Sequence, residues 1–91
     1  MDLQSKVEAF PPYQVIESAE FAEQFTKLVP DPRLRDELQR EFYSVLPLDP
    51  EQFPQVPGTK LRAVTIASFP ALTLFFTIKD RIITLLEIHP L

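Results

Sequence analysis

The residues best suited to chemistry lie in the last third of the chain. His89 is the only histidine, and imidazole is the side chain best suited to acid–base catalysis near neutral pH. Four cationic side chains precede it and could contact a phosphate group; they are Lys60, Arg62, Lys79 and Arg81. Each also has a simpler interpretation, because a terminal histidine and the cations of strands and turns are commonly solvated. The residue types alone leave both interpretations open.

Composition excludes several other kinds of site. The chain has no cysteine, which excludes disulfides, thiol catalysis and cysteine-ligated metals. A single glycine excludes a glycine-rich phosphate-binding loop, and neither metal-ligand spacing nor a Ser-His-Asp arrangement is found. We therefore expect no cofactor and no metal. Tyr13 and Tyr43 could stack on bases, but their places in an expected strand and an expected helix favour packing.

The charge is unevenly spread along the 91 residues, whose net charge is −4. Residues 1–59 hold five cations and eleven acids, which gives −6, and residues 60–91 hold four cations and two acids, which gives +2. An acidic chain is a poor non-specific binder of nucleic acid. The absence of an apolar run of about 20 residues predicts no membrane helix. Together with the lack of cysteine and of a signal-like N-terminus, this fits a cytoplasmic protein.

The first half of the chain predicts a strand and two helices after an N-terminal tail. Residues 1–12 end in two prolines and form the tail, so a single domain is expected over residues 13–91. Residues 13–17 favour a strand. Ser18 and Asp31 are the N-caps of two amphipathic helices that end before Pro30 and Pro47, and so short a link predicts a helical hairpin. Asp36 and Arg40 have the spacing of a helical ion pair.

The second half predicts a sheet after a proline-rich connection. Residues 47–59 should be extended and held by Phe53 and Val56. Strands are expected over residues 61–67, 71–78 and 81–88, joined by Ser68-Phe69-Pro70 and by a hairpin turn at Lys79-Asp80. The order β-α-α-β-β-β indicates an α+β fold, in which the helical hairpin packs on one face of an antiparallel sheet.

The two faces of that sheet have different expected roles. Alternation in the middle strand assigns one face to the core, through Leu72, Leu74, Phe76 and Ile78. Because two helices cover only one face, Phe75, Ile83 and Leu85 are expected on the other face. An apolar second face favours a partner-binding surface, with coverage by the tail or the proline-rich connection as the alternative.

The sequence resembles the RelE/ParE superfamily of toxins from bacterial type II toxin–antitoxin modules. The resemblance spans residues 13–89. It is carried by YQVIESAEFAEQF at the start, by Leu61-Arg62, and by the terminal segment ALTLFFTIKDRIITLLEIH. It implies a toxin that a cognate antitoxin neutralises. RelE-like members cut mRNA, usually on the ribosome, whereas ParE-like members inhibit DNA gyrase. A homodimer is a further expected partner, and no membrane is involved.

For an RNase, the resemblance implies His89 as the acid or base and Arg62 as the best-placed cation. Lys60, Lys79 and Arg81 would then join Arg62 as phosphate contacts. The chain departs from the RNase pattern at Leu72-Thr73, Thr77 and Glu87, where active members often have basic or aromatic residues. Two hypotheses therefore stand: an active toxin of the RelE or ParE type, or a catalytically degenerate, non-enzymatic interaction module on the same scaffold.

Overall fold

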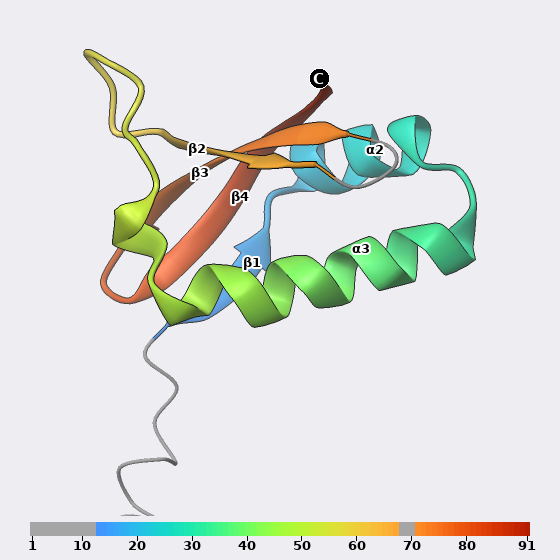
Figure 1. Cartoon of the computed structure of the whole chain (residues 1–91), viewed down its shortest axis with the longest axis horizontal. Coiled ribbons are helices and arrows are strands. Elements are labelled where there is room, and N and C mark those ends of the chain that lie inside the picture. The colour runs from blue at the N-terminus through green and yellow to red at the C-terminus, as the bar shows by residue number, and fades with distance from the viewer. Residues whose placement is uncertain (1–12, 68–70) are drawn as a thin grey trace, which may run out of the picture.

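The computed structural model describes residues 13–67 and 71–91 and has an α+β architecture (Figure 1). The expected tail at residues 1–12 and the Ser68-Phe69-Pro70 connection lie outside the described residues. The described helices and strands are, in chain order, β1 (Gln14–Glu17), α2 (Ala19–Leu28), α3 (Pro32–Val45), the 3-10 turns η1 (Leu46–Leu48) and η2 (Pro50–Gln52), β2 (Arg62–Ile66), β3 (Leu72–Lys79) and β4 (Ile82–Pro90). The predicted α+β class is confirmed.

Both helices begin at the predicted caps. The Ser18 hydroxyl accepts a hydrogen bond from the Phe21 amide at 3.1 Å, and the Asp31 carboxylate accepts one from the Arg33 amide at 3.0 Å. Pro32 follows in the first turn of α3, where its missing N–H costs no hydrogen bond. The chain then reverses, so that α3 runs back beneath the sheet (Figure 1).

The sheet is mixed, with strand order β1-β4-β3-β2. β2, β3 and β4 are antiparallel neighbours, as predicted, but β1 pairs with β4 in parallel. The prediction of an antiparallel sheet is therefore wrong for β1. The physical reason is the helical connection: a parallel partner needs a long crossover, and the two helices between β1 and the later strands supply one.

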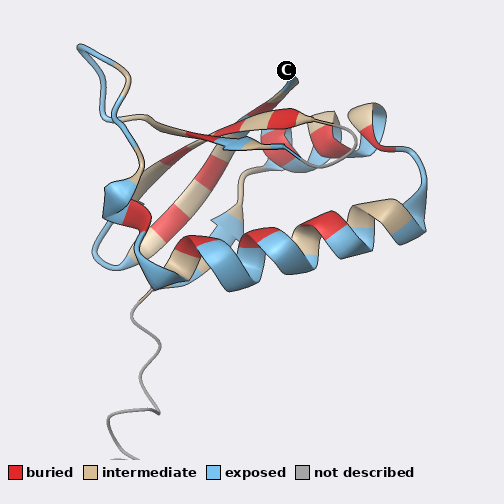
Figure 2. Cartoon of the chain, viewed as in Figure 1, coloured by how far each residue is buried: buried red, intermediate tan, exposed pale blue. Residues whose placement is uncertain are grey.

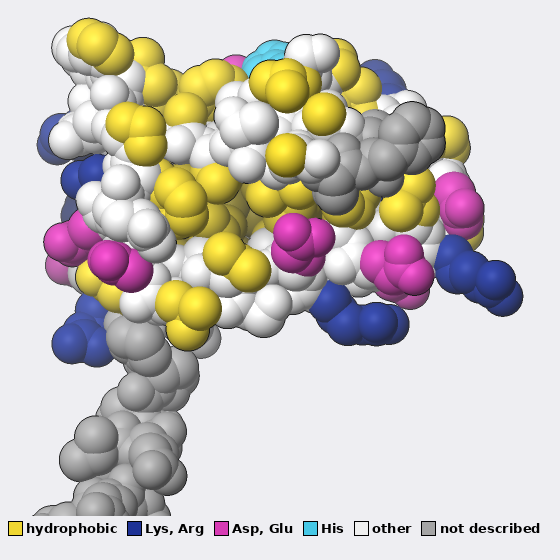
Figure 3. All heavy atoms as spheres, viewed as in Figure 1, with side chains coloured by type: hydrophobic (Ala, Val, Ile, Leu, Met, Phe, Trp, Pro, Cys, Tyr) yellow, Lys and Arg dark blue, Asp and Glu magenta, His cyan; other side chains and the backbone are white. Residues whose placement is uncertain are grey.

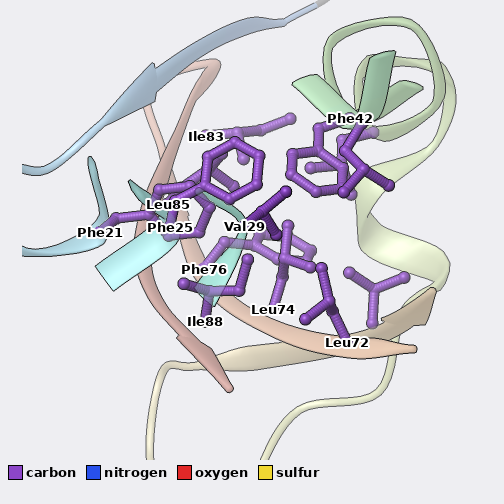
Figure 4. Close-up of a cluster of buried hydrophobic side chains, with 13 residues drawn as sticks. Phe21, Phe25, Val29, Phe42, Leu72, Leu74, Phe76, Ile83, Leu85 and Ile88 are labelled. Carbon is purple, nitrogen blue, oxygen red and sulfur yellow. The ribbon is translucent and has the colours of Figure 1, made fainter. Parts of the chain in front are cut away.

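The core lies between the helices and one face of the sheet (Figure 2). Leu72, Leu74 and Phe76 point into it, as the alternation predicted, and each is at most 1% exposed. From the helices, Phe25 stacks at a tilt on Phe42, with ring centroids 5.6 Å apart. Figure 4 shows helix and strand side chains converging on this one cluster. Both helices therefore cover the same face of the sheet.

Ile83 and Leu85 also belong to this core, and their predicted place on the opposite face is wrong. Both are 0% exposed. Ile83 pairs with Ile78 and Leu85 pairs with Phe76, and directly paired residues share a face. A β-bulge follows, because Phe76 pairs with Leu85 whereas Phe75 pairs with Glu87. Strict alternation cannot anticipate that extra residue.

The hairpin between β3 and β4 turns one residue later than predicted. Lys79 still pairs with Ile82, so Asp80 and Arg81 are the central residues instead of Lys79 and Asp80. Both have positive φ, 53° and 66°, as a type I′ hairpin turn requires. Neither residue is glycine, so the left-handed backbone carries strain at both positions.

The proline-rich connection is less extended than predicted, because its first part forms the two 3-10 turns. Phe53 does hold it: its ring meets the Phe76 ring edge-on at 6.0 Å, at the margin of the core. Val56 contributes through its backbone, whose N–H donates to the Leu61 carbonyl at 2.8 Å.

The inward placement of Leu85 on β4 can be tested by mutation. We expect Leu85→Ala to lower the free energy of unfolding by about 3 kcal/mol, because it leaves a cavity in a packed core. Thr65→Ala, on an exposed strand residue, should cost less than about 1 kcal/mol. Denaturant titrations measure both values. Equal costs at the two positions would contradict the placement of Leu85.

Candidate functional site

The face of the sheet away from the helices is the first candidate surface. We call it the outer face, and the strand register defines its members. No helix of the described chain packs on it. Its central side chains are uncharged, and charge occurs only at its ends. The outer-face residues are Gln14 and Ile16 on β1, Ala63 and Thr65 on β2, Thr73, Phe75, Thr77 and Lys79 on β3, and Ile82, Thr84, Glu87 and His89 on β4.

His89 lies at one end of the outer face, paired with Glu87. Its Nε2 is 2.9 Å from a Glu87 carboxylate oxygen, and the two side chains are about half exposed. The β-bulge brings both residues onto this face, beside Phe75, whose ring centroid is 5.8 Å from that of the imidazole. An exposed contact of this kind fits a solvated pair as well as an acid–base role, so the predicted role of His89 stays a prediction.

A small groove beside His89 includes a cation that the sequence did not suggest. Lys27, from the last turn of α2, lines this groove of about 160 Å³ together with Gln24 and His89. The approach of Lys27 to His89 depends on how α2 crosses β4, for which the linear sequence carries no signal.

Arg62 is not brought to His89. It pairs with Phe76, which places it on the helix-covered face of the sheet. Its guanidinium donates hydrogen bonds to the backbone carbonyls of Glu51 at 3.1 Å and Phe53 at 2.7 Å. Arg62 therefore holds the η2 segment against β2. The two predicted catalytic residues lie on opposite faces of the sheet.

The other predicted phosphate contacts are also dispersed. Lys79 and Arg81 flank Asp80 at the hairpin turn, at the far end of β4 from His89. His89 lies seven residues after Ile82 along β4, which corresponds to about 23 Å of strand. Lys60 shares a groove of about 310 Å³ with Arg62, but the Glu51 carboxylate lines the same groove and opposes anion binding there.

A further groove runs along α3 and was not expected from the sequence. It has a volume of about 530 Å³ and is lined by Asp36, Gln39, Arg40 and Tyr43. Two of these residues hold Glu17 of β1: the Gln39 amide donates to its carboxylate at 2.6 Å, and the Tyr43 hydroxyl donates at 3.4 Å. Figure 3 shows acidic and basic side chains together along this helix.

Both tyrosines donate to carboxylates, which fits the packing role favoured by the sequence. Partial burial, and then the negative charge of Glu17, raise the pKa of Tyr43. The Tyr13 hydroxyl donates to Glu51 at 3.2 Å, and desolvation together with this hydrogen bond raises the pKa of Tyr13.

Neither other kinds of site nor known proteins give this chain an assignment. Among residues 13–67 and 71–91, no group of three acidic or histidine side chains is arranged to hold a metal ion. No helix in this part of the chain is both long and apolar enough to cross a membrane. The sequence matches no protein-family model, and no curated protein matches it significantly.

The structural role of Arg62 can be tested against a phosphate-binding role. We expect Arg62→Ala to lower the free energy of unfolding by about 1–2 kcal/mol, because two carbonyls lose a charged donor. Lys60→Ala, the matched loss of a neighbouring exposed cation, should change it by less than about 0.5 kcal/mol. Thermal and denaturant unfolding measure both. A destabilisation no larger than that of Lys60→Ala would show that the Arg62 bonds contribute nothing to the fold.

The raised pKa of Tyr43 predicts a loss of folding stability at alkaline pH. Because its pKa is raised in the folded state, the folded protein binds more protons than the unfolded chain above about pH 10. Stability therefore falls as the pH rises through that range. Tyr43→Phe should weaken this fall, whereas Glu41→Gln, on the same helix, should leave it unchanged. The measurement is the unfolding midpoint in denaturant between pH 8 and pH 11.

Proposed function

We propose that this chain is a RelE/ParE-type toxin of a bacterial toxin–antitoxin module, and that it acts by binding a protein rather than by cutting RNA. The element order β-α-α-β-β-β, with both helices on one face of the sheet, is consistent with that scaffold. The terminal β3–β4 hairpin, which carried the resemblance in sequence, forms the centre of the sheet.

The observation that favours protein binding is the character of the outer face. Phe75 lies there among threonine and isoleucine side chains, and the described helices leave this face uncovered. Uncharged, partly apolar surfaces of this kind suit protein partners, whereas phosphate recognition needs clustered cations. The antitoxin and the target would both engage this face, with Phe75 as an anchor.

The dispersal of the cations argues against the RelE-like alternative. Cleavage through the RNA 2′-hydroxyl needs an acid, a base and cations around one phosphate. His89 and Glu87 could supply proton transfer, but Arg62 faces the other side of the sheet, and Lys79 and Arg81 lie near its far end. A ParE-like action, of which inhibition of DNA gyrase is the family's example, requires no such cluster.

The same dispersal supports a second candidate, an interaction module without toxicity. In that case the outer face binds a partner, and nothing in the cell is poisoned. This candidate and the ParE-like toxin share the same surface but differ in the consequence of expression, so a growth experiment separates them.

Induced expression in a bacterium tests the proposal. We expect growth arrest, which Phe75→Asp abolishes because it places a charge at the centre of the binding face. Thr65→Asp, which adds the same charge at the margin of the sheet, should retain most of the effect. Circular dichroism of the purified variants checks that both are folded. Normal growth at high expression would reject the toxin and favour the interaction module.

A ribosome assay separates the two modes of toxicity. Purified protein added to translating ribosomes should leave the mRNA intact. His89→Ala and Arg62→Ala should accordingly keep the growth arrest, provided that they fold. If the wild-type protein cleaves the mRNA and His89→Ala does not, the protein-binding mode is wrong and a RelE-like nuclease is favoured.

A further inference from the structure

The two edges of the sheet differ in how far they are covered. At the β2 edge, the proline-rich connection supplies backbone partners: the Ala63 N–H donates to the Pro54 carbonyl at 3.1 Å, and Gln55 forms a bridge with Arg62. No comparable bridge is made at the β1 edge within the part of the chain that the structure describes. β1 therefore offers the more open template for an added strand.

The backbone hydrogen bonds of β1 show which groups are available. The Gln14 N–H donates to the Arg81 carbonyl at 2.9 Å, and the Ser18 N–H donates to the Leu85 carbonyl at 3.0 Å. Alternate residues of a strand direct their backbone groups to the same side, so those of Val15 and Glu17 point away from β4. No hydrogen bond reaches these groups from residues 13–67 or 71–91.

The groove along α3 lies close to β1. Gln39 and Tyr43 of α3 donate hydrogen bonds to the Glu17 carboxylate, and both also line the groove of about 530 Å³. The groove residues are spaced i, i+3, i+4 and i+7, so they form one stripe of the helix. A strand added to β1 would lie over this stripe.

The stripe carries one charge of each sign. Asp36 and Arg40 lie one helical turn apart, and the expected ion pair between them is not formed. Neither side chain takes part in an ion pair with another residue of the described chain. When two copies of this stripe lie antiparallel, Asp36 of one helix faces Arg40 of the other. This is charge complementarity with an identical surface.

We propose that two copies of this chain associate through their β1 strands, antiparallel, about a twofold axis at Ile16. In this register Val15 exchanges backbone hydrogen bonds with Glu17 of the second copy. Ile16, which is 46% exposed, meets its own counterpart on the outer face. The two α3 helices lie under the joined edge, with Asp36 directed towards Arg40 of the second copy.

The twofold register favours a second copy of this chain over an unrelated strand, because the same residues supply both sides of the contact. A twofold axis at Ile16 uses the outward donors and acceptors of both strands and places Glu17 opposite valine. An axis at Glu17 would set two carboxylates opposite each other, which is unfavourable. An isologous contact of this kind stops at two copies and leaves no free β1 edge.

Sedimentation equilibrium tests the dimer on the full chain at concentrations up to about 200 µM, a range suited to a modest interface. Wild type should show a monomer–dimer equilibrium. Ile16→Lys places like charges across the axis and should raise the dissociation constant at least about tenfold. Thr65→Lys, an exposed residue on the other edge strand, should leave it unchanged.

A charge exchange at α3 tests the second element of the contact. Arg40→Asp and Asp36→Arg should each weaken the dimer, and the double variant should restore it, because the exchange preserves the pairing across the axis. Failure of the double variant to recover would remove α3 from the contact. Each variant's melting temperature, measured in dilute solution, separates lost association from lost folding.

Hydrogen exchange reads the β1 edge directly. The amides of Val15 and Glu17 should exchange more slowly as the protein concentration rises, while that of Thr65 should not change. A monomer at every concentration, or a dimer that Ile16→Lys leaves intact, would overturn the proposal. These readouts do not depend on toxicity, so the growth experiment can fail while the dimer stands, and the reverse also holds.

Discussion

The pairing of β3 with β4 is the constraint on which the rest of the structure depends. It sets Ile83 opposite Ile78 and Leu85 opposite Phe76, and thereby completes the apolar face on which both helices pack. The bulge near Phe75 then shifts the alternation, so that Ile88 also faces inward, while Glu87 and His89 face outward. One extra residue thus decides both the extent of the core and the composition of the candidate site.

Most of the local structure follows from the sequence because local chemistry determines it. Ser18 and Asp31 cap helices through hydrogen bonds made within one turn, and the prolines limit those helices by steric exclusion. The inward face of β3 follows from simple alternation. These features need no information about the distant parts of the chain.

The errors arise where distant parts of the chain meet. The parallel pairing of β1 with β4 depends on how the two helices cross the sheet. The inward placement of Ile83 and Leu85 depends on their pairing with Ile78 and Phe76 of β3. The separation of His89 from Arg62 depends on which face each strand residue occupies. The groove along α3 is lined by residues of that helix, two of which also bind Glu17 of the distant strand β1. The residue types identify candidate site residues, but only the pairing register of the strands decides which of these residues lie close together.

The pairing of β1 with β4 has a consequence for how the chain is made. Gln14 is aligned with Ile82, so β1 emerges from the ribosome long before its only neighbour in the described sheet. The helices can form during synthesis, but they have no complete surface to pack on until the final hairpin closes. Such distant pairing adds a loop-closure cost before any gain and slows folding. The native sheet should therefore form only after β4 has been synthesised, when it can pair with the β1 strand made much earlier.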